Sequence, residues 1–461
     1  MNSISQKQID DTHTFEDKTI SVLERVFPAP RSFGIRLWDG RELPGASNPS
    51  FTLVLKEPGS LRRMFTPPIE LSLGEAYIQG DLDIEGDLLK AVFLIDELTD
   101  NNAFSALEVA GLLRDIATLP TLDTKSRAMT RGPLELSGKV HSLERDKKAI
   151  KYHYDVGNDF YEYWLDPYMQ YSCAYFIKGD ETIEQAQLQK MEHICRKLRL
   201  QPGERLLDVG CGWGGLARYA AEHYNVQVLG VTLSEQQAKY ASEKVKNTGL
   251  ANKVKIKFSD YRKLDEDPFD KAVSVGMFEH VGRPNLPEYF STIYRLLVPG
   301  GLFLNHGISR KATPEDVPAS LVGKKGAMPF KEDHKGLLNL DEKIFGWGTF
   351  SQRYIFPDGE LVPVSLANLV AEGAGFDVRD VENLREHYAK TTRRWVRRLG
   401  NNEATLIKLV GEEVYRTWRL YLSVSAHSFE IGNIGIHQSL LAKLDHGKAH
   451  LPMTRADIYS T

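Results

Sequence analysis

The chain has 461 residues, which is long for a single domain and predicts two. Hydrophobic residues make up 42% of it and charged residues 26%, as in ordinary soluble globular proteins, and the formal net charge of -4 gives no overall field that would attract nucleic acid. Three cysteines are too few for a disulfide framework, which fits a reducing compartment.

The sequence shows neither a secretory signal nor a membrane-spanning segment. Its N-terminal residues lack the apolar core of a signal peptide, and no apolar run approaches the ~20 residues that a spanning helix needs. We therefore expect a cytoplasmic protein, whose contact with lipid would be peripheral and at the inner face of the membrane.

The N-terminal part carries the pattern of a small sheet with helices. Alternating apolar residues predict strands at 51–55 and 69–73, and the glycines of segment 74–86 predict tight turns. Apolar residues on one face predict a helix over 87–98. Residues 1–122 are therefore expected to form an α+β domain, and the polar, charged residues 123–148 a linker that becomes a surface helix.

From residue 202 onward, strands and helices alternate. A helix between the second and third strands is indicated by Ser234 and Gln237, which have the spacing of a capping box. The order is typical of an α/β protein with a mostly parallel, doubly wound sheet. The predicted strands are 205–209, 226–231, 253–258, 269–275 and 301–306, and the predicted helices flanking them include 216–224 and 287–297.

The first of these strands runs into a glycine-rich turn, Asp208-Val-Gly-Cys-Gly-Trp-Gly-Gly215. Gly210 and Gly212 allow the backbone to turn sharply and to approach a ligand, which in such sheets binds at the carboxyl ends of the strands. A dinucleotide is one alternative, because the turn begins G-x-G, and a turn without a ligand is another. S-adenosylmethionine is favoured because Asp208 precedes the first glycine and because Asp260 ends the third strand, where it could accept the adenine amino group.

The second strand ends without the acidic residue that usually binds the ribose hydroxyls. Gln237 is the candidate for this role, through its neutral amide. No metal site is expected, because no C-x-x-C pair is present. The remaining candidates for the cofactor site are Tyr171, Ser172, Trp213, Gly214, Thr232, Leu233 and Tyr261.

Further motifs flank the turn on both sides. They are Tyr152-His-Tyr-Asp-Val-Gly-Asn-Asp-Phe-Tyr161, Gln170-Tyr-Ser-Cys-Ala-Tyr-Phe176, Gly276-Met-Phe-Glu-His-Val-Gly282, Asn305-His-Gly-Ile308, Tyr354-Ile-Phe-Pro-Asp-Gly359 and His387-Tyr-Ala-Lys-Thr-Thr-Arg-Arg-Trp395. With the glycine turn, seven segments in this order closely resemble the cyclopropane fatty acid synthase family. The resemblance runs from about residue 140 to the C-terminus.

The resemblance implies a Rossmann-like S-adenosylmethionine-dependent methyltransferase fold over residues 149–461, with lipid-binding insertions. It also implies the reaction: the cis double bond of an acyl chain in a membrane phospholipid attacks the sulfonium methyl group, a carbocation forms, and loss of a proton from the new methyl group closes a cyclopropane ring. The family is thought to hold a bicarbonate ion as the base. Cys173, Glu279, His306, Tyr388 and the backbone of Ile308 match its bicarbonate shell.

Each of these residues also has a structural interpretation. Cys173 is equally consistent with a small buried hydrophobe, His306 with a hydrogen-bonded core histidine and Tyr388 with plain core. Glu279 has the alternative of capping a helix or pairing with Arg283.

Lipid contact has three candidate regions. Thr391–Leu399 places four arginines around a tryptophan, and Tyr415–Leu422 is a second basic and aromatic segment; a solvated charged face is the alternative for the first. The N-terminal domain resembles the accessory domain of longer family members, which is similar to sterol-carrier modules, and is expected to bind lipid or to mediate a homodimer. Residues 309–350 carry no assignable motif, and a substrate-facing lid is one interpretation.

Three other functions remain open from the sequence. They are a fatty-acid methyltransferase with a methyl-branched product, a lipid-binding carrier with a degenerate methyltransferase domain, and a small-molecule methyltransferase. The preferred double-bond position and the lipid headgroup are not indicated by any motif.

Overall fold

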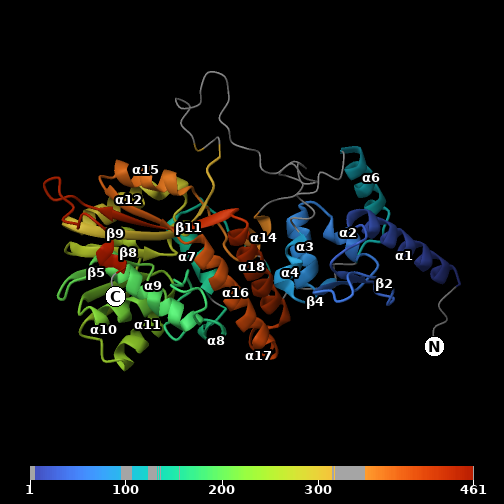
Figure 1. The fold of residues 1–461 in the computed structure, drawn as a ribbon, viewed down its shortest axis with the longest axis horizontal. Helices are drawn as coiled ribbons and strands as arrows, with labels where there is room; N and C mark the ends of the chain where they lie inside the picture. Colours follow the sequence, from blue (N-terminus) through green and yellow to red (C-terminus); the bar gives the residue numbers. More distant parts are fainter. Residues whose placement is uncertain are drawn as a thin grey trace, which may run out of the picture. The chain divides into compact units, whose positions relative to one another are not determined.

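The computed structural model describes residues 6–94, 106–122, 136–154, 156–313 and 348–459, with the isolated residues 132, 134 and 316. The chain divides into two compact units (Figure 1). The first unit comprises residues 1–133, 331–355 and 403–427, and the second comprises residues 134–330, 356–402 and 428–461.

The second unit is built on a seven-stranded sheet of order β10-β11-β9-β8-β5-β6-β7. The five strands predicted from the sequence are present and run parallel: β5 (Arg205–Val209), β6 (Gln227–Thr232), β7 (Val254–Phe258), β8 (Phe269–Val275) and β9 (Leu297–Arg310). Two further strands were not predicted: β11 (Ile434–Ala442) pairs antiparallel with β9, and β10 (Asp377–Asn383) pairs antiparallel with β11. The predicted fold class, α/β with a mostly parallel sheet, is confirmed.

Helices cover both faces of this sheet, as in a doubly wound fold (Figure 1). Successive residues of β9 point to opposite faces of the sheet. Phe303 packs against the helices over residues 286–296 and 364–373, whereas Leu302 and Leu304 pack against the helices over residues 183–198 and 215–223 on the other face. Among the described residues, the helices of the unit include α7 (Leu143–Tyr154), α8 (Asn158–Glu162), α9 (Ile183–Leu198), α10 (Gly215–His223), α11 (Glu235–Asn247), α12 (Leu286–Leu296), α15 (Val364–Gly373), α16 (Arg385–Asn401) and α19 (Ala456–Tyr459).

The strand order reverses at β5. The chain leaves β5 for β6 on one side and later returns to β8 on its other side. The carboxyl ends of β5 and β8 therefore flank the position where open α/β sheets bind their ligands.

The first unit contains a four-stranded sheet of order β2-β1-β3-β4. The predicted strand at 51–55 is confirmed as β3 (Phe51–Leu55). The other strands are β1 (Gly34–Arg36), β2 (Glu42–Leu43) and β4 (Leu82–Gly86), and the helices include α1 (Gln6–Val26), α2 (Ser60–Met64), α3 (Ile69–Ile78), α4 (Leu88–Ala91) and α6 (Ala106–Ala117).

The predicted strand at 69–73 is wrong, because these residues begin helix α3. Pro68 is the N-cap of α3, and Glu70 in its first turn complements the helix dipole. A run of five alternating residues is too short to separate the two periodicities. The predicted helix over 87–98 is present as α4, and residues 95–98 lie outside the described residues.

Residues 403–427, which the sequence assigned to the catalytic domain, belong to the first unit. They form α17 (Glu403–Val410) and most of α18 (Glu412–Glu430). The guanidinium of Arg416 donates to the backbone oxygens of Tyr77 (2.8 Å) and Leu82 (3.0 Å), and Trp418 is buried. The arginine and tryptophan of α18 therefore stabilise this unit, and the interpretation of 415–422 as a lipid-binding segment has no support in their placement.

Helix α14 (Thr349–Tyr354) also belongs to the first unit, where the Tyr354 hydroxyl donates to Glu75 of α3 at 2.7 Å. The region 309–350 lies largely outside the described residues, and the predicted lid with it. Within the described part of the chain, every helix is too short or too polar to span a bilayer.

Candidate active site

The glycine-rich turn lies at the carboxyl end of β5, at the reversal point of the sheet. Its first glycine, Gly210, has a φ of +79°, and a Cβ there would lie 2.8 Å from the side chain of Met277. The backbone N–H groups of Gly210 and Cys211 both donate to the Val231 oxygen at 2.9 Å, which ties the turn to the end of β6. The turn therefore needs glycine at position 210, as predicted.

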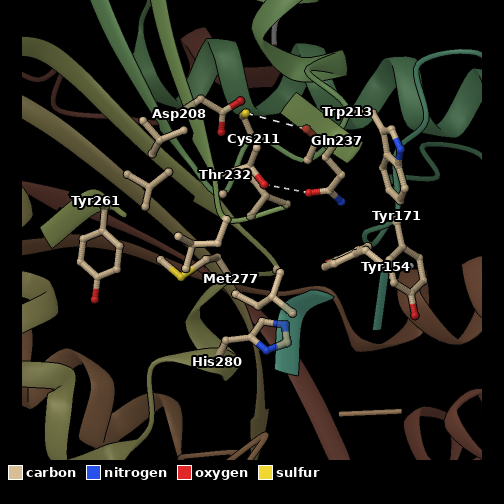
Figure 2. Close-up of a pocket in the computed structure, with 18 of the residues that line it drawn as sticks. Tyr154, Tyr171, Asp208, Cys211, Trp213, Thr232, Gln237, Tyr261, Met277 and His280 are labelled. Atoms are coloured by element: carbon tan, nitrogen blue, oxygen red, sulfur yellow. Dashed lines mark hydrogen bonds between the residues drawn. The ribbon is translucent and has the colours of Figure 1, made fainter. Parts of the chain in front are cut away.

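A pocket opens beside this turn (Figure 2). It is enclosed by α7, the segment 169–172, the turn, the end of β6, residues 259–262 and the residues after β8. Ten of the twelve predicted cofactor residues line it: Tyr171, Ser172, Asp208, Gly210, Gly212, Trp213, Thr232, Leu233, Gln237 and Tyr261. Among the described residues, no group of His, Cys, Asp and Glu could hold a metal ion.

Gln237 is held in place by Thr232, whose hydroxyl donates to the side-chain oxygen of Gln237 at 2.8 Å (Figure 2). Ser234 caps α11 by accepting from the backbone N–H of Gln237. The Gln237 side chain does not complete a capping box, because Thr232 has bound its oxygen. Its nitrogen lies 4.0 Å from where a Cβ of Gly212 would be, so the amide lies next to the glycine turn.

Two predicted cofactor residues do not line the pocket. Asp260 accepts from the Arg262 backbone N–H at 2.9 Å and from its guanidinium at 2.7 and 2.9 Å, so the carboxylate is already bound. The adenine contact of Asp260 stays a prediction. Gly214 is the N-cap of α10, and a Cβ there would lie 3.0 Å from Ala241 of α11, so this glycine permits close helix packing.

Several lining residues were not predicted: Asp146, Ile150 and Tyr154 of α7, Arg262, Met277 and His280. Helix α7 was interpreted as a charged surface helix, although Asp146 is buried and pairs with Arg262 at 3.0 Å. Burial lowers the pKa of His280 to about 4, so its imidazole is neutral at pH 7. The motif 152–161 contains Tyr154 and was the available signal for α7.

None of the five predicted bicarbonate-shell residues lines this pocket. Two of them adjoin lining residues in the chain: Cys173 follows Ser172, and Glu279 lies between Met277 and His280. The Oε1 of Glu279 accepts from the Ile308 backbone N–H at 2.6 Å, and its Oε2 is buried without a partner. The Ile308 amide, predicted to donate to bicarbonate, thus donates to Glu279 here.

The alternative pairing of Glu279 with Arg283 is not observed. The backbone N–H of Arg283 donates to Glu360 at 2.8 Å, and its guanidinium pairs with Asp316 at 3.0 Å. Burial of Glu279 without a cation raises its pKa to about 7. Near neutral pH the carboxyl group therefore exchanges a proton readily.

His306 lies on β9 and is fully buried. Its Nδ1 is 3.2 Å from the side-chain nitrogen of Gln438 on β11, and its Nε2 is buried without a partner. An amide nitrogen can only donate, so Nδ1 accepts and the proton lies on Nε2. Burial, with Lys190 and Lys197 nearby, lowers the pKa of His306 well below its usual value. His306 is a neutral imidazole with one unpaired N–H donor.

Cys173 contacts the start of α16, the helix that carries Tyr388. The Cys173 thiol donates to the Leu384 oxygen at 3.7 Å, and the Tyr388 backbone N–H donates to the same oxygen at 3.0 Å. Burial raises the pKa of Cys173, so it is a thiol and not a nucleophilic thiolate. The backbone N–H of Leu384 donates to the backbone oxygen of Ile436 on β11. Gln438, two residues further along β11, pairs with His306 on β9, so β11 links the start of α16 to His306.

Two of these residues carry the kinds of atom that bind a small anion such as bicarbonate. An unpaired N–H of His306 and an unpaired oxygen of Glu279 are the donor and the acceptor that a bicarbonate ion needs, and both atoms are buried. The strands that carry them are adjacent, since Glu279 follows β8 and β8 pairs with β9.

The family model described as mycolic acid cyclopropane synthetase matches residues 141–439. The chain belongs to the cyclopropane synthase family. A second model, for a domain of unknown function, matches residues 20–106.

Relatives of this cyclopropane synthase family member carry two kinds of name. A probable fatty acid methyltransferase of Pseudomonas putida is 41% identical over 427 residues, which cover 92% of this chain and 95% of the relative. The cyclopropane-fatty-acyl-phospholipid synthase of Escherichia coli K12 is 38% identical over 314 residues, covering 67% and 72%. The crystal structure of mycolic acid cyclopropane synthase CmaA1 with SAH and CTAB shares 34% identity and a TM-score of 0.56, covering 64% of this chain and 97% of that one.

The fold and these neighbours make the protein an S-adenosylmethionine-dependent methyltransferase of the cyclopropane synthase family. In this family member the arginine-rich segment 391–399 is not an exposed aromatic anchor. Trp395 is fully buried, and Arg393 forms an ion pair with Glu430. The Arg394 guanidinium donates to the backbone oxygen of Glu181 at 2.9 Å. The lipid-binding interpretation of this helix is therefore wrong as far as its tryptophan is concerned.

Proposed function

We propose that the protein transfers a methylene group from S-adenosylmethionine to the cis double bond of unsaturated acyl chains in membrane phospholipids, forming a cyclopropane ring. One observation carries the proposal. Glu279, a buried carboxyl group with an unpaired oxygen, lies in the chain between two residues that line the methyl-donor pocket. Such a group could take up the proton that the new methyl group must lose before the ring can close.

The chemistry explains why such a group is useful. The alkene forms a bond to the sulfonium methyl carbon, the sulfur–methyl bond breaks, and S-adenosylhomocysteine leaves. The resulting carbocation closes a second carbon–carbon bond when the new methyl group loses a proton. Glu279, with a pKa of about 7, is suited to accept or relay that proton near neutral pH.

The bicarbonate ion stays part of the proposal. When bound, it would supply the base that takes the proton. Glu279 Oε2 would accept its O–H group and His306 Nε2 would donate to an oxygen, because both atoms are buried and unpaired. Tyr388 and Cys173 would complete the shell at the start of α16. A neutral His306 and a protonated Cys173 would add no charge beside the carbocation, and a thiol is a weaker nucleophile than a thiolate.

A methyl-branched product is the second candidate. It is favoured by the relatives named probable fatty acid methyltransferase, such as the Pseudomonas putida protein that aligns over 92% of this chain. Both reactions use the same methyl donor and the same first bond. They differ in the fate of the carbocation.

We test these two functions on vesicles of a phosphatidylglycerol with one cis double bond in each acyl chain. The protein and S-adenosylmethionine are added, and the acyl chains are analysed by gas chromatography and mass spectrometry. A cyclopropane chain is the expected product, and a methyl-branched chain would overturn the proposal. The free unsaturated fatty acid, tested in parallel, is expected to react poorly, and preference for it would shift the substrate away from phospholipid.

We also propose that the protein meets this substrate peripherally, at the inner face of the membrane, and that the first unit binds lipid or mediates a homodimer. The support is chemical: the acyl chains lie in the bilayer, and none of the helices in the described residues could span it. Co-sedimentation with anionic vesicles, compared in low and high salt, measures the first part. Sedimentation velocity measures the second.

A further inference from the structure

Helix α9 covers one face of the sheet, yet several of its most buried side chains are polar or charged. Gln187, Lys190 and Lys197 all have an exposed fraction of 0%. Burying an ammonium group is costly unless partners compensate for the lost water. Each buried lysine of α9 therefore needs a local explanation.

Lys197 is explained by its ion pairs. Its ammonium lies 3.1 Å from Asp380 and 2.5 Å from Glu382, both on β10. This lysine stabilises the contact between α9 and the edge of the sheet, and neither of its partners lines the cofactor pocket.

Lys190 has different partners. Its ammonium donates to the Ser172 hydroxyl at 2.9 Å and to the side-chain oxygen of Gln170. Both partners are neutral, and both line the cofactor pocket. Burial lowers the pKa of Lys190 to about 8, and the neighbouring carboxyl groups of Asp166 and Asp208 favour its charged form, so it remains a cation at pH 7.

Gln187 lies one turn earlier on the same face of α9. Its side-chain nitrogen donates to the backbone oxygens of Ser172 (2.9 Å) and Gln170 (3.3 Å). Lys190 and Gln187 together thus bind side chains and backbone of the same two residues. Asp166 fixes the preceding residues, because it accepts from the backbone N–H groups of Tyr168 (2.9 Å) and Gln170 (2.7 Å).

We propose that Lys190 is a positioning residue of the methyl-donor site, which with Gln187 fixes the segment 170–172 as one wall of the cofactor pocket. The lysine acts through Gln170 and Ser172 and does not itself line the pocket. Cys173 follows the fixed segment directly, so the same contacts also set where the proposed anion shell begins. The inference rests on the methyl-donor part of the proposed function and not on the product formed.

The test compares Lys190→Met with Lys197→Met, which removes a second fully buried lysine from the same helix. Affinity for S-adenosylhomocysteine is measured by isothermal titration calorimetry, and folding by thermal unfolding. Lys190→Met is expected to raise Kd about tenfold, because two hydrogen bonds from a cation are lost. Lys197→Met is expected to lower Tm but to change Kd by less than about twofold. A folded Lys190→Met with unchanged Kd would overturn the proposal.

If Lys190→Met does not fold, the same Kd measurement on Gln187→Leu tests the proposal. It keeps the buried cation and removes only the contacts to the backbone of 170 and 172, so a Kd raised about threefold or more supports the proposal, and an unchanged Kd contradicts it. In steady-state assays the same variants are expected to raise the KM for S-adenosylmethionine more than they lower kcat. The binding assay contains no lipid, so a methyl-branched product would refute the proposed reaction and leave this inference standing.

Discussion

The glycine turn of the methyl-donor pocket and the buried residues Glu279 and His306 are carried by neighbouring strands but are built in different ways. The glycine turn is a local structure, in which Gly210 leaves room for the side chain of Met277 and the backbone is hydrogen-bonded to the end of β6. Glu279 follows β8 and His306 lies within β9, and each has one buried, unpaired polar atom. Under the proposed function, binding of the donor and removal of the proton depend on different residues, and single substitutions should separate them.

The largest effect is expected from Glu279→Gln. It keeps the shape of the side chain but removes its capacity to take a proton, so turnover should fall about a thousandfold. Affinity for S-adenosylhomocysteine should change by less than about twofold, since the pocket wall is untouched. Turnover and calorimetry measure the two, and Glu235→Gln, at an exposed position on α11, is the matched control. Near-normal turnover of Glu279→Gln would mean that Glu279 has no role in proton removal.

The second effect concerns stability and pH. The pKa of Glu279 is raised in the folded protein to about 7 from an ordinary 4.5. The folded state thus holds this proton more tightly, so its stabilising effect is complete below pH 4.5 and is lost as pH rises through 7. Relative to Glu279→Gln, the wild type should lose roughly 2–3 kcal/mol between pH 5 and pH 9. Urea unfolding across this range measures it, and parallel curves for the two proteins would show that Glu279 is not buried as an isolated acid.

The third effect concerns the glycine turn alone. Gly210→Ala forces a side chain into a backbone with φ of +79° and toward Met277, so we expect affinity for S-adenosylhomocysteine to fall about tenfold or more. Gly249→Ala is the control, because Gly249 has a φ of +73° with no atom within 4 Å of a new Cβ. Both should be less stable in thermal unfolding, but only Gly210→Ala should bind poorly. Equal affinities of the two variants would show that donor binding does not depend on glycine at position 210.

The smallest effect is expected from Thr232→Val. It removes the hydroxyl that holds the Gln237 amide, so that affinity for S-adenosylmethionine should fall about threefold. Thr248→Val, whose hydroxyl bonds only to the backbone oxygens of α11, is the matched control and should bind normally. Calorimetry distinguishes them, and an unaffected Thr232→Val would argue against Gln237 as the ribose contact.

The sequence predicted the parallel strands and the glycine turn because both are local patterns. It missed β10, whose residues Asp377–Asn383 are mostly polar and only partly buried, and β11, which begins with a glycine-containing run. These two strands add to the sheet only through long-range pairing, and they carry Gln438 and the contact of Ile436 with Leu384. No local pattern indicates such pairing.

Side chains that the fold buries were the other source of error. Trp395 and Trp418 stand among arginines in the sequence, which favours a lipid-facing surface, but both are buried in the structure. Lys190 went unnoticed because a lysine in a helix ordinarily faces solvent. The shell residues Cys173, Glu279, His306 and Tyr388 were found only through the family resemblance, because residues so far apart in the chain have no common local pattern.

The central claim is that the carbocation loses a proton from the transferred carbon. The most direct measurement uses S-adenosylmethionine with a fully deuterated methyl group and an unsaturated phospholipid, followed by mass spectrometry and proton NMR of the acyl chain. The account predicts a cyclopropane ring whose new carbon retains two of its three deuterium atoms. An unsaturated, methyl-branched chain that keeps all three, formed by loss of a proton from a neighbouring chain carbon, would contradict it.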